Sequence, residues 1–123
     1  MIHFDSSFLI RSLIAGTSEE IRLVSWRGAG ETVGISAIAW GEFLCGPVTR
    51  TDEALVRKLF PVPEAYTAVD AEQAARLFNA TGRRSRSLAD CSIAAIAIRL
   101  GARLATSNLA DFQPFVNHGL ALA

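Results

Sequence analysis

The alternation of short apolar segments with longer helical segments constrains the fold of this chain more than any other feature. Four short runs, at 2–4, 32–36, 102–107 and 119–123, have the length and apolar character of strands. Between them, helices are expected over 6–15, 17–30, 36–46, 51–60, 70–82, 88–101 and 108–112. Strands that alternate with helices in this way predict a parallel sheet covered on both faces. The expected fold is an α/β, three-layer α/β/α sandwich with a central, mostly parallel sheet, formed by a single domain over 1–123.

The composition is that of a domain with a large core and no excess of charge. Hydrophobic residues make up 50% of the 123 residues, and the mean hydropathy is +0.30. These values predict a core buried on several sides and an apolar face shared with a partner. The 12 basic and 12 acidic residues give a net charge of zero, so nucleic-acid binding has to come from local clusters of charge.

The cysteines, histidines and apolar stretches argue against a zinc protein, a secreted protein and a membrane protein. Cys45 and Cys91 lie in apolar helical segments outside any metal-ligand pattern, which predicts two reduced thiols in the core. His3 and His118 are isolated residues, expected in the core and on the surface, so no zinc site is expected. Asp5 interrupts the first apolar run, and no apolar stretch reaches the ~20 residues that span a bilayer. We therefore expect no signal peptide, no membrane segment and a cytoplasmic location.

Two acidic residues stand in apolar surroundings. Asp5 ends the first expected strand, at the edge of the sheet where ligands bind in open parallel sheets. The alternative is that Asp5 caps the following helix, although Ser6 or Ser7 can also provide that cap. Glu42 is the only charged residue of an otherwise apolar helix, and its burial would require a partner or an aqueous cleft. The structural alternatives for Glu42 are an ion pair with an arginine or a single exposed stripe on the helix.

Two further acids lie in the first turns of helices. Asp90 begins the helix expected over 88–101, where the helix dipole alone would explain an acid. Asp111 follows Asn108 by three positions, which resembles a capping box. The strands at 2–4 and 102–107 end at the same edge of the sheet, and a right-handed crossover can lay them side by side. That placement would bring Asp5 near Asp111, but it does not fix the positions of the other two acids.

Acids that converge at one edge point to metal chemistry. Carboxylates repel one another, and their pKa values rise unless a cation neutralises them. An oxygen-only site suits a hard divalent ion such as Mg²⁺, which takes one or two carboxylates together with waters and substrate phosphate oxygens. Ser6 and Ser7 have no adjacent histidine base, so neither is an expected nucleophile. Water activated by a metal is the better candidate for attack on phosphorus.

Four segments of the chain carry a resemblance to a known family. Its acidic residues are similar in order and spacing to the motifs of PIN domains: Asp5 in MIHFDSSFLI, Glu42 in ISAIAWGEFLCG, Asp90 in SLADCSIAAIAIRLGARL and Asp111 in ATSNLADF. The chain most resembles the VapC-type toxins of bacterial toxin–antitoxin pairs, over essentially its whole length. The T-x-N-x-x-D-F ending is the most recognisable part.

The resemblance implies a function, partners and a set of site residues. It implies a Mg²⁺- or Mn²⁺-dependent endoribonuclease that hydrolyses RNA phosphodiester bonds. It also implies a homodimer, silenced by a small cognate antitoxin whose tail enters the active-site groove. A metal would be held by the first three acids, and the fourth would bind a second metal or hold a water. The catalytic and metal-binding residues implied are Asp5, Glu42, Asp90 and Asp111.

Other polar residues are candidates for supporting roles. Ser6 and Asn108 could orient carboxylates or water, a role that is compatible with helix capping. The densest basic cluster precedes the helix of Asp90 and suits phosphate oxygens through paired donors, with a solvated loop as the alternative. The candidate RNA-binding residues of this cluster are Arg83, Arg84 and Arg86.

The chain departs from the family pattern at two places, and other functions are compatible with its acids. Ser107 stands where many relatives carry an arginine or another longer polar residue, and the helix after Cys45 is short. A reduced helical pair would change the dimer and antitoxin surface. The alternatives are a catalytically silent PIN-like module that binds protein or RNA, and a nuclease acting on DNA. An aspartyl-phosphate phosphatase would require a second aspartate at position 7, which is serine.

Overall fold

A four-stranded sheet and seven α-helices make up the computed structural model, which describes residues 1–123. The strands are β1 (Ile2–Phe4), β2 (Val33–Ile35), β3 (Arg103–Ala105) and β4 (Ala121–Leu122). The helices are α1 (Ser6–Ser12), α2 (Ser18–Gly28), α3 (Ala37–Leu44), α4 (Arg50–Leu59), α5 (Ala68–Ala80), α6 (Leu88–Leu100), α7 (Leu109–Phe112) and the 3₁₀ helix η1 (Gln113–His118).

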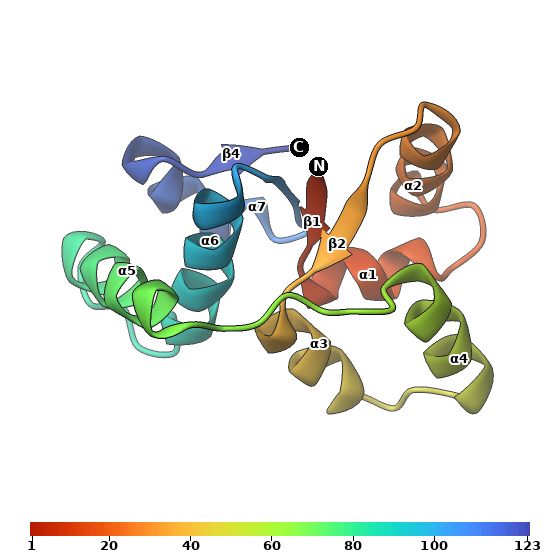
Figure 1. The fold of residues 1–123 in the computed structure, drawn as a ribbon, viewed down its shortest axis with the longest axis horizontal. Coiled ribbons are helices and arrows are strands. Elements are labelled where there is room, and N and C mark those ends of the chain that lie inside the picture. Colours follow the sequence, from red (N-terminus) through yellow and green to blue (C-terminus); the bar gives the residue numbers. More distant parts are fainter.

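The sheet is parallel throughout, and its strands lie in the order β2-β1-β3-β4 (Figure 1). The central strand β1 pairs with both neighbours in the same register, so that Ile2 is opposite Val33 on one side and Arg103 on the other. The carboxyl ends of β1, β2 and β3 therefore meet at one edge. The expected parallel sheet is confirmed, and so is the crossover that returns the chain beside the first strand.

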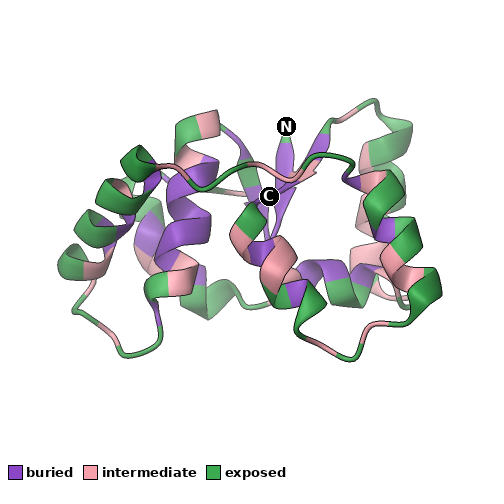
Figure 2. Ribbon diagram, turned by 60° about the horizontal axis from the view of Figure 1, so that its bottom comes forward, coloured by how far each residue is buried: buried purple, intermediate pink, exposed green.

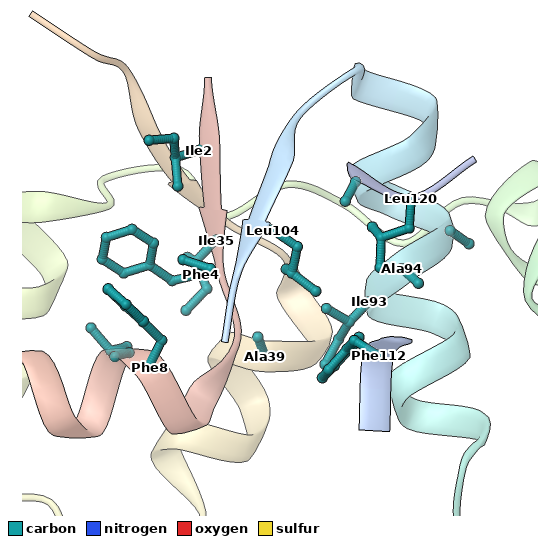
Figure 3. Close-up of a cluster of buried hydrophobic side chains, with 14 of the residues drawn as sticks. Ile2, Phe4, Phe8, Ile35, Ala39, Ile93, Ala94, Leu104, Phe112 and Leu120 are labelled. Carbon is teal, nitrogen blue, oxygen red and sulfur yellow. The ribbon is translucent and has the colours of Figure 1, made fainter. Parts of the chain in front are cut away.

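Helices pack on both faces of the sheet, as the alternation of elements predicted. In Figure 1, α5 and α6 lie on one side of the strands, and α1, α2 and α4 lie on the other. Figure 3 shows Ile2 and Phe8 on one side of the sheet, with Ile93 and Ala94 on the other. The central helix is α6, in which every residue of 91–97 is buried, while α2 has no fully buried residue (Figure 2). None of the helices combines the length and apolar character that crossing a membrane requires.

Local capping explains where most helices begin. Four helices start after a threonine or serine whose side chain accepts a backbone N–H three residues on: Thr17, Ser36, Thr49 and Thr67. Gly101 ends α6 with a φ of 64°, a left-handed conformation that glycine adopts without strain. The chain then turns directly into β3, which brings it back to the centre of the sheet.

An ion pair anchors α6 to α5. Arg99 donates from Nε to Asp70 Oδ1 over 2.7 Å and from Nη2 to Asp70 Oδ2 over 3.0 Å. Asp70 is 1% exposed, and it also forms a capping box with Thr67 at the start of α5. Because α6 is held at its carboxyl end and along its buried face, the position of its amino end is fixed at the sheet edge.

Several local expectations are corrected by the structure. Asp5, rather than Ser6 or Ser7, caps α1, because its carboxylate reaches the N–H of Phe8, and the helix ends at Ser12. Cys45 is exposed just beyond α3, whereas Cys91 is buried, so only one of the two thiols expected in the core lies there. The helix η1 was not predicted, because its six residues include a proline and lack a helical pattern. His3 is buried and His118 is exposed, as expected.

Candidate active site

The site begins where the two central strands end. The Asp5 N–H donates to the Ala105 carbonyl over 3.1 Å, so the residues that follow β1 and β3 lie side by side. Asp5 and Thr106 are both buried there, although both are polar. A buried carboxylate without donors is costly, so its hydrogen bonds define the local geometry.

Asp5 is held by hydroxyl and backbone donors and by no cation. Its Oδ1 accepts from the Phe8 N–H over 2.8 Å and from Ser7 Oγ over 2.7 Å. Its Oδ2 accepts from Thr106 Oγ1 over 2.6 Å. Burial raises the pKa of Asp5, and these hydrogen bonds oppose that rise. Asp5 therefore caps a helix and also stands at the carboxyl edge of the sheet, so the capping interpretation is compatible with a role in the site.

Glu42 lies on α3 and faces the same edge. The helix is buried on one side only, at Ala39 and Phe43, and Glu42 itself is exposed, so the burial expected from its apolar sequence is wrong. Ser6 Oγ donates to Glu42 Oε1 over 3.3 Å, which connects α1 to α3. Desolvation of its carboxylate by the neighbouring chain raises the pKa of Glu42, the hydrogen bond from Ser6 opposes the rise, and the negative charge of Asp5 adds to it. No arginine pairs with this carboxylate, so the exposed stripe is the correct structural description.

Asp90 is the electrostatic centre of the site. It lies in the first turn of α6, beside α7, which carries the exposed Asp111. Burial raises the pKa of Asp90 to about 6, and the negative charges of Asp111, Glu42 and Asp5 add to the effect. Arg84 opposes it. Three carboxylates from separate parts of the chain thus act on Asp90 at this edge of the sheet.

The arrangement fits a hard cation that needs few direct protein ligands. No group of three or more histidine, cysteine, aspartate or glutamate side chains is arranged so that it could hold a metal ion by itself. The available donors at this edge are carboxylate oxygens, and Asp5 Oδ2 accepts only one hydrogen bond, which leaves a lone pair free. Mg²⁺ takes one or two carboxylates and keeps several waters, so it fits this donor set, whereas a tetrahedral zinc site does not.

The loop after β3 supplies groups that sequence reasoning missed. Ser7 and Thr106 both donate to Asp5, and their own oxygens accept the N–H groups of Ser107 and Asn108. From the sequence, Ser7 was a candidate helix cap and was rejected as a nucleophile, whereas in the structure its hydroxyl donates to Asp5 and accepts from the Ser107 N–H. Asn108 is at the cap position of α7, but its side chain makes no capping hydrogen bond, so the capping box expected with Asp111 is absent.

The three arginines expected to bind RNA separate into different environments. Arg84 is half-buried, with Nη2 3.4 Å from the Asp111 carbonyl oxygen and its guanidinium over the Phe115 ring. Its Nε is buried without a hydrogen-bond partner. Arg83 instead turns back onto α5, where it bonds to Asn79. Arg86 is exposed and has a φ of 67°, so the three arginines differ in their contacts and exposure.

The parallel sheet with an acidic edge defines the class of protein. A family model of the PIN domain matches residues 2–113, and the chain belongs to the PIN domain family. Its fold is that of the VapC-type toxins of toxin–antitoxin pairs, as the resemblance of its acidic motifs predicted. Comparison with curated protein sequences gave no significant match.

Solved structures share this fold over nearly the whole chain. The VapBC2 complex of Rickettsia felis, bound to a promoter DNA fragment, matches with a TM-score of 0.76 and 16% identity, covering 100% of this chain and 98% of that one. A toxin–antitoxin complex from Klebsiella pneumoniae matches with a TM-score of 0.70 and 25% identity, covering 91% and 90%. VapC20 of Mycobacterium tuberculosis, a toxin that cleaves the sarcin–ricin loop, matches with a TM-score of 0.63 and 21% identity, covering 86% and 87%.

Proposed function

We propose that this chain is a metal-dependent endoribonuclease that acts as the toxin of a toxin–antitoxin pair. The observation that carries the proposal is the approach of four carboxylates at one sheet edge, where burial of Asp90, together with the charges of Asp111, Glu42 and Asp5, raises the pKa of Asp90 to about 6. A cluster of this kind lowers the stability of the fold unless a cation binds to it. Membership of the PIN domain family supports a nuclease, and the solved toxin–antitoxin complexes support the biological role.

Each acid has a distinct place in the proposed site. Asp5 and Asp90 are the least exposed of the four, and Asp5 is already oriented by three donors, so they are the proposed principal ligands. Glu42, oriented by Ser6, would act from the α3 side through a water bound to the metal. Asp111 would bind a second ion or hold a water. When bound, Mg²⁺ or Mn²⁺ supplies an activated water for hydrolysis of the phosphodiester.

Arg84 is the proposed phosphate contact among the arginines. It is the one basic residue whose charge acts on Asp90, and Phe115 and the Asp111 carbonyl hold it at the border of the site. A guanidinium at this position can donate to phosphate oxygens while the acids hold the cation. Arg83 and Arg86 fit the alternative of a solvated loop. Any contact they make with RNA would be at the periphery of the site. Asn108, with a free exposed side chain, is the proposed water- or substrate-orienting group.

Cleavage by the purified protein tests the proposal directly. We expect a structured RNA to be cut in millimolar Mg²⁺ or Mn²⁺ and to remain intact in EDTA, and a DNA of the same sequence to remain intact. Asp5→Asn and Asp90→Asn should each lower the cleavage rate by more than about 100-fold, since each removes a ligand. Glu72→Gln, an equal charge change on the exposed face of α5, is the control.

The outcomes of this experiment separate the alternatives. Cleavage of DNA in place of RNA would change the substrate class, and metal binding without cleavage of either would favour a silent binding module. Cleavage that persists in both aspartate variants, with circular dichroism unchanged, would refute the proposed site.

An apolar groove between α2 and α4 is the proposed docking surface for the antitoxin. It has a volume of about 510 Å³ and is lined by Leu23, Val24, Leu55 and Leu59. Leu55 is 54% exposed, so the groove presents apolar area to solvent. Arg27 and Lys58 also line it and suit an acidic, amphipathic helix. The pair of helices that the sequence predicted to be reduced at this surface consists of the eight-residue α3 and the ten-residue α4.

A homodimer and a cytoplasmic location remain part of the proposal.

A further inference from the structure

Glu19 is a largely buried carboxylate that lies outside the four acids of the site. It is in the first turn of α2, and its side chain is 12% exposed. Its Oε1 accepts from Arg11 Nε and from Ser107 Oγ, each over 3.0 Å, and its Oε2 accepts from Ser18 Oγ over 3.2 Å. One carboxylate therefore joins α1, α2 and the loop that follows β3.

The first turn of a helix favours an acid, but the dipole does not explain these contacts. Glu20, the next residue, also lies in the first turn, and its side chain accepts only from the Gly16 N–H beside it. Glu19 reaches instead to residues from two other parts of the fold. A hydrogen bond from its own N–H, with those from Arg11, Ser107 and Ser18, lowers the pKa of Glu19 to about 2. Its charge is present throughout the physiological range.

A continuous chain of hydrogen bonds leads from Glu19 to Asp5. The Ser107 hydroxyl donates to Glu19, and the Ser107 N–H donates to Ser7 Oγ over 3.0 Å. Ser7 Oγ in turn donates to Asp5 Oδ1 over 2.7 Å. Because the Ser107 N–H donates to a lone pair of Ser7 Oγ, the hydroxyl proton of Ser7 is directed to the Asp5 carboxylate. The orientation of the Ser107 peptide thus decides which way the Ser7 hydroxyl points.

We infer that Glu19 is a positioning residue for the Asp5 carboxylate and acts on it through Ser107 and Ser7. The inference rests on the proposed function, since it treats Asp5 as a metal ligand. It gives a role to Ser107, the position at which this chain departs from the family pattern. A short hydroxyl side chain fits here because Glu19 is already within 3.0 Å of it. Arg11, from α1, holds the other side of the acceptor oxygen.

Mn²⁺ affinity, measured by calorimetry, tests this inference without reference to cleavage. Ser107→Ala removes the hydroxyl that bonds to Glu19, and Glu19→Ala removes the acceptor. Each should weaken Mn²⁺ binding by about 3–10-fold. This is less than the 10–100-fold loss that is typical when a group bonded directly to a metal-binding side chain is removed. The double variant should be no weaker than the single variants, because both remove the same interaction.

Two conservative variants distinguish positioning from general stability. Ser107→Thr keeps the hydroxyl and should restore the affinity, and Glu20→Gln makes a charge change one residue away and should leave it unchanged. Equal Mn²⁺ affinity in Ser107→Ala and the parent chain would overturn the inference, as would additive losses in the double variant. If Glu19→Ala does not fold, Ser107→Ala alone decides. Failure of the parent chain to bind Mn²⁺ would instead reject the proposed function.

Discussion

At the scale of the residue, the Asp90 carboxyl is ionised at neutral pH in an environment that favours its neutral form. Its pKa of about 6 in the folded chain lies above the ordinary value of 3.8. Between these two values the folded state binds more protons than the unfolded state, so stability falls as the pH rises through this window. Above pH 6 the loss is complete, and below pH 3.8 it disappears. The residue thus lowers the stability of the metal-free fold where the enzyme would work.

Asp90→Asn should therefore stabilise the metal-free protein while it removes activity. We expect a gain of about 1–2 kcal/mol in the free energy of unfolding at pH 7.5, below the full linkage value because solvent screens a half-buried group. The gain should shrink at pH 5, where the parent carboxyl is largely protonated. Urea unfolding in EDTA at the two pH values measures it, with Glu72→Gln as the matched charge control. A destabilised Asp90→Asn at pH 7.5 would contradict the electrostatic description of the site.

At the scale of the element, the pairing of α5 with α6 depends on Asp70. Burial alone would raise the pKa of Asp70, but the hydrogen bonds from Arg99 and Thr67 outweigh it and the pKa is lowered. The stability it provides is present above pH 3.8 and is lost as the pH falls through the lowered value. Because Asp70 is buried, the pair contributes more than an ion pair on an exposed helix face.

Asp70→Asn is expected to destabilise the fold by about 2–3 kcal/mol, near the lower end for a broken buried pair because Arg99 remains partly exposed. Glu53→Gln, which removes an exposed i,i+4 pair with Arg57 on α4, should cost less than about 0.5 kcal/mol. Chemical denaturation at pH 7 compares the two. Equal losses in both variants would show that the Asp70 contact is no stronger than a surface pair.

At the scale of the whole molecule, the acidic edge and the apolar groove are separate surfaces. The groove lies between α2 and α4, while the acids lie at the ends of β1, α6 and α7 and on α3. Figure 2 shows that α2 and α4 carry mostly exposed or half-buried residues. A change in the groove should consequently affect a partner without affecting the chemistry.

Leu55→Asp should weaken antitoxin binding by about 10-fold or more, which is typical for loss of a buried apolar anchor. Cleavage of RNA and the unfolding midpoint should change little, because Leu55 is exposed. The partner in this test is the cognate antitoxin, and titration calorimetry with both purified proteins gives the affinity. Unchanged affinity would place the antitoxin on another surface, and lost cleavage would show that the two surfaces are coupled.

The sequence by itself determined the elements and the types of residue at their ends. Apolar periodicity and caps such as Thr17 and Gly101 act within a few residues, so they place strands, helices and the acids at strand and helix ends. The tertiary structure alone decided which groups meet. Thr106 reaches Asp5 across 101 positions and Ser107 reaches Glu19 across 88, while the neighbours Arg83 and Arg84 bond to different partners, Asn79 and the Asp111 carbonyl. Hydrogen bonds depend on atoms within about 3 Å, a distance that packing of the sheet sets and local sequence does not encode.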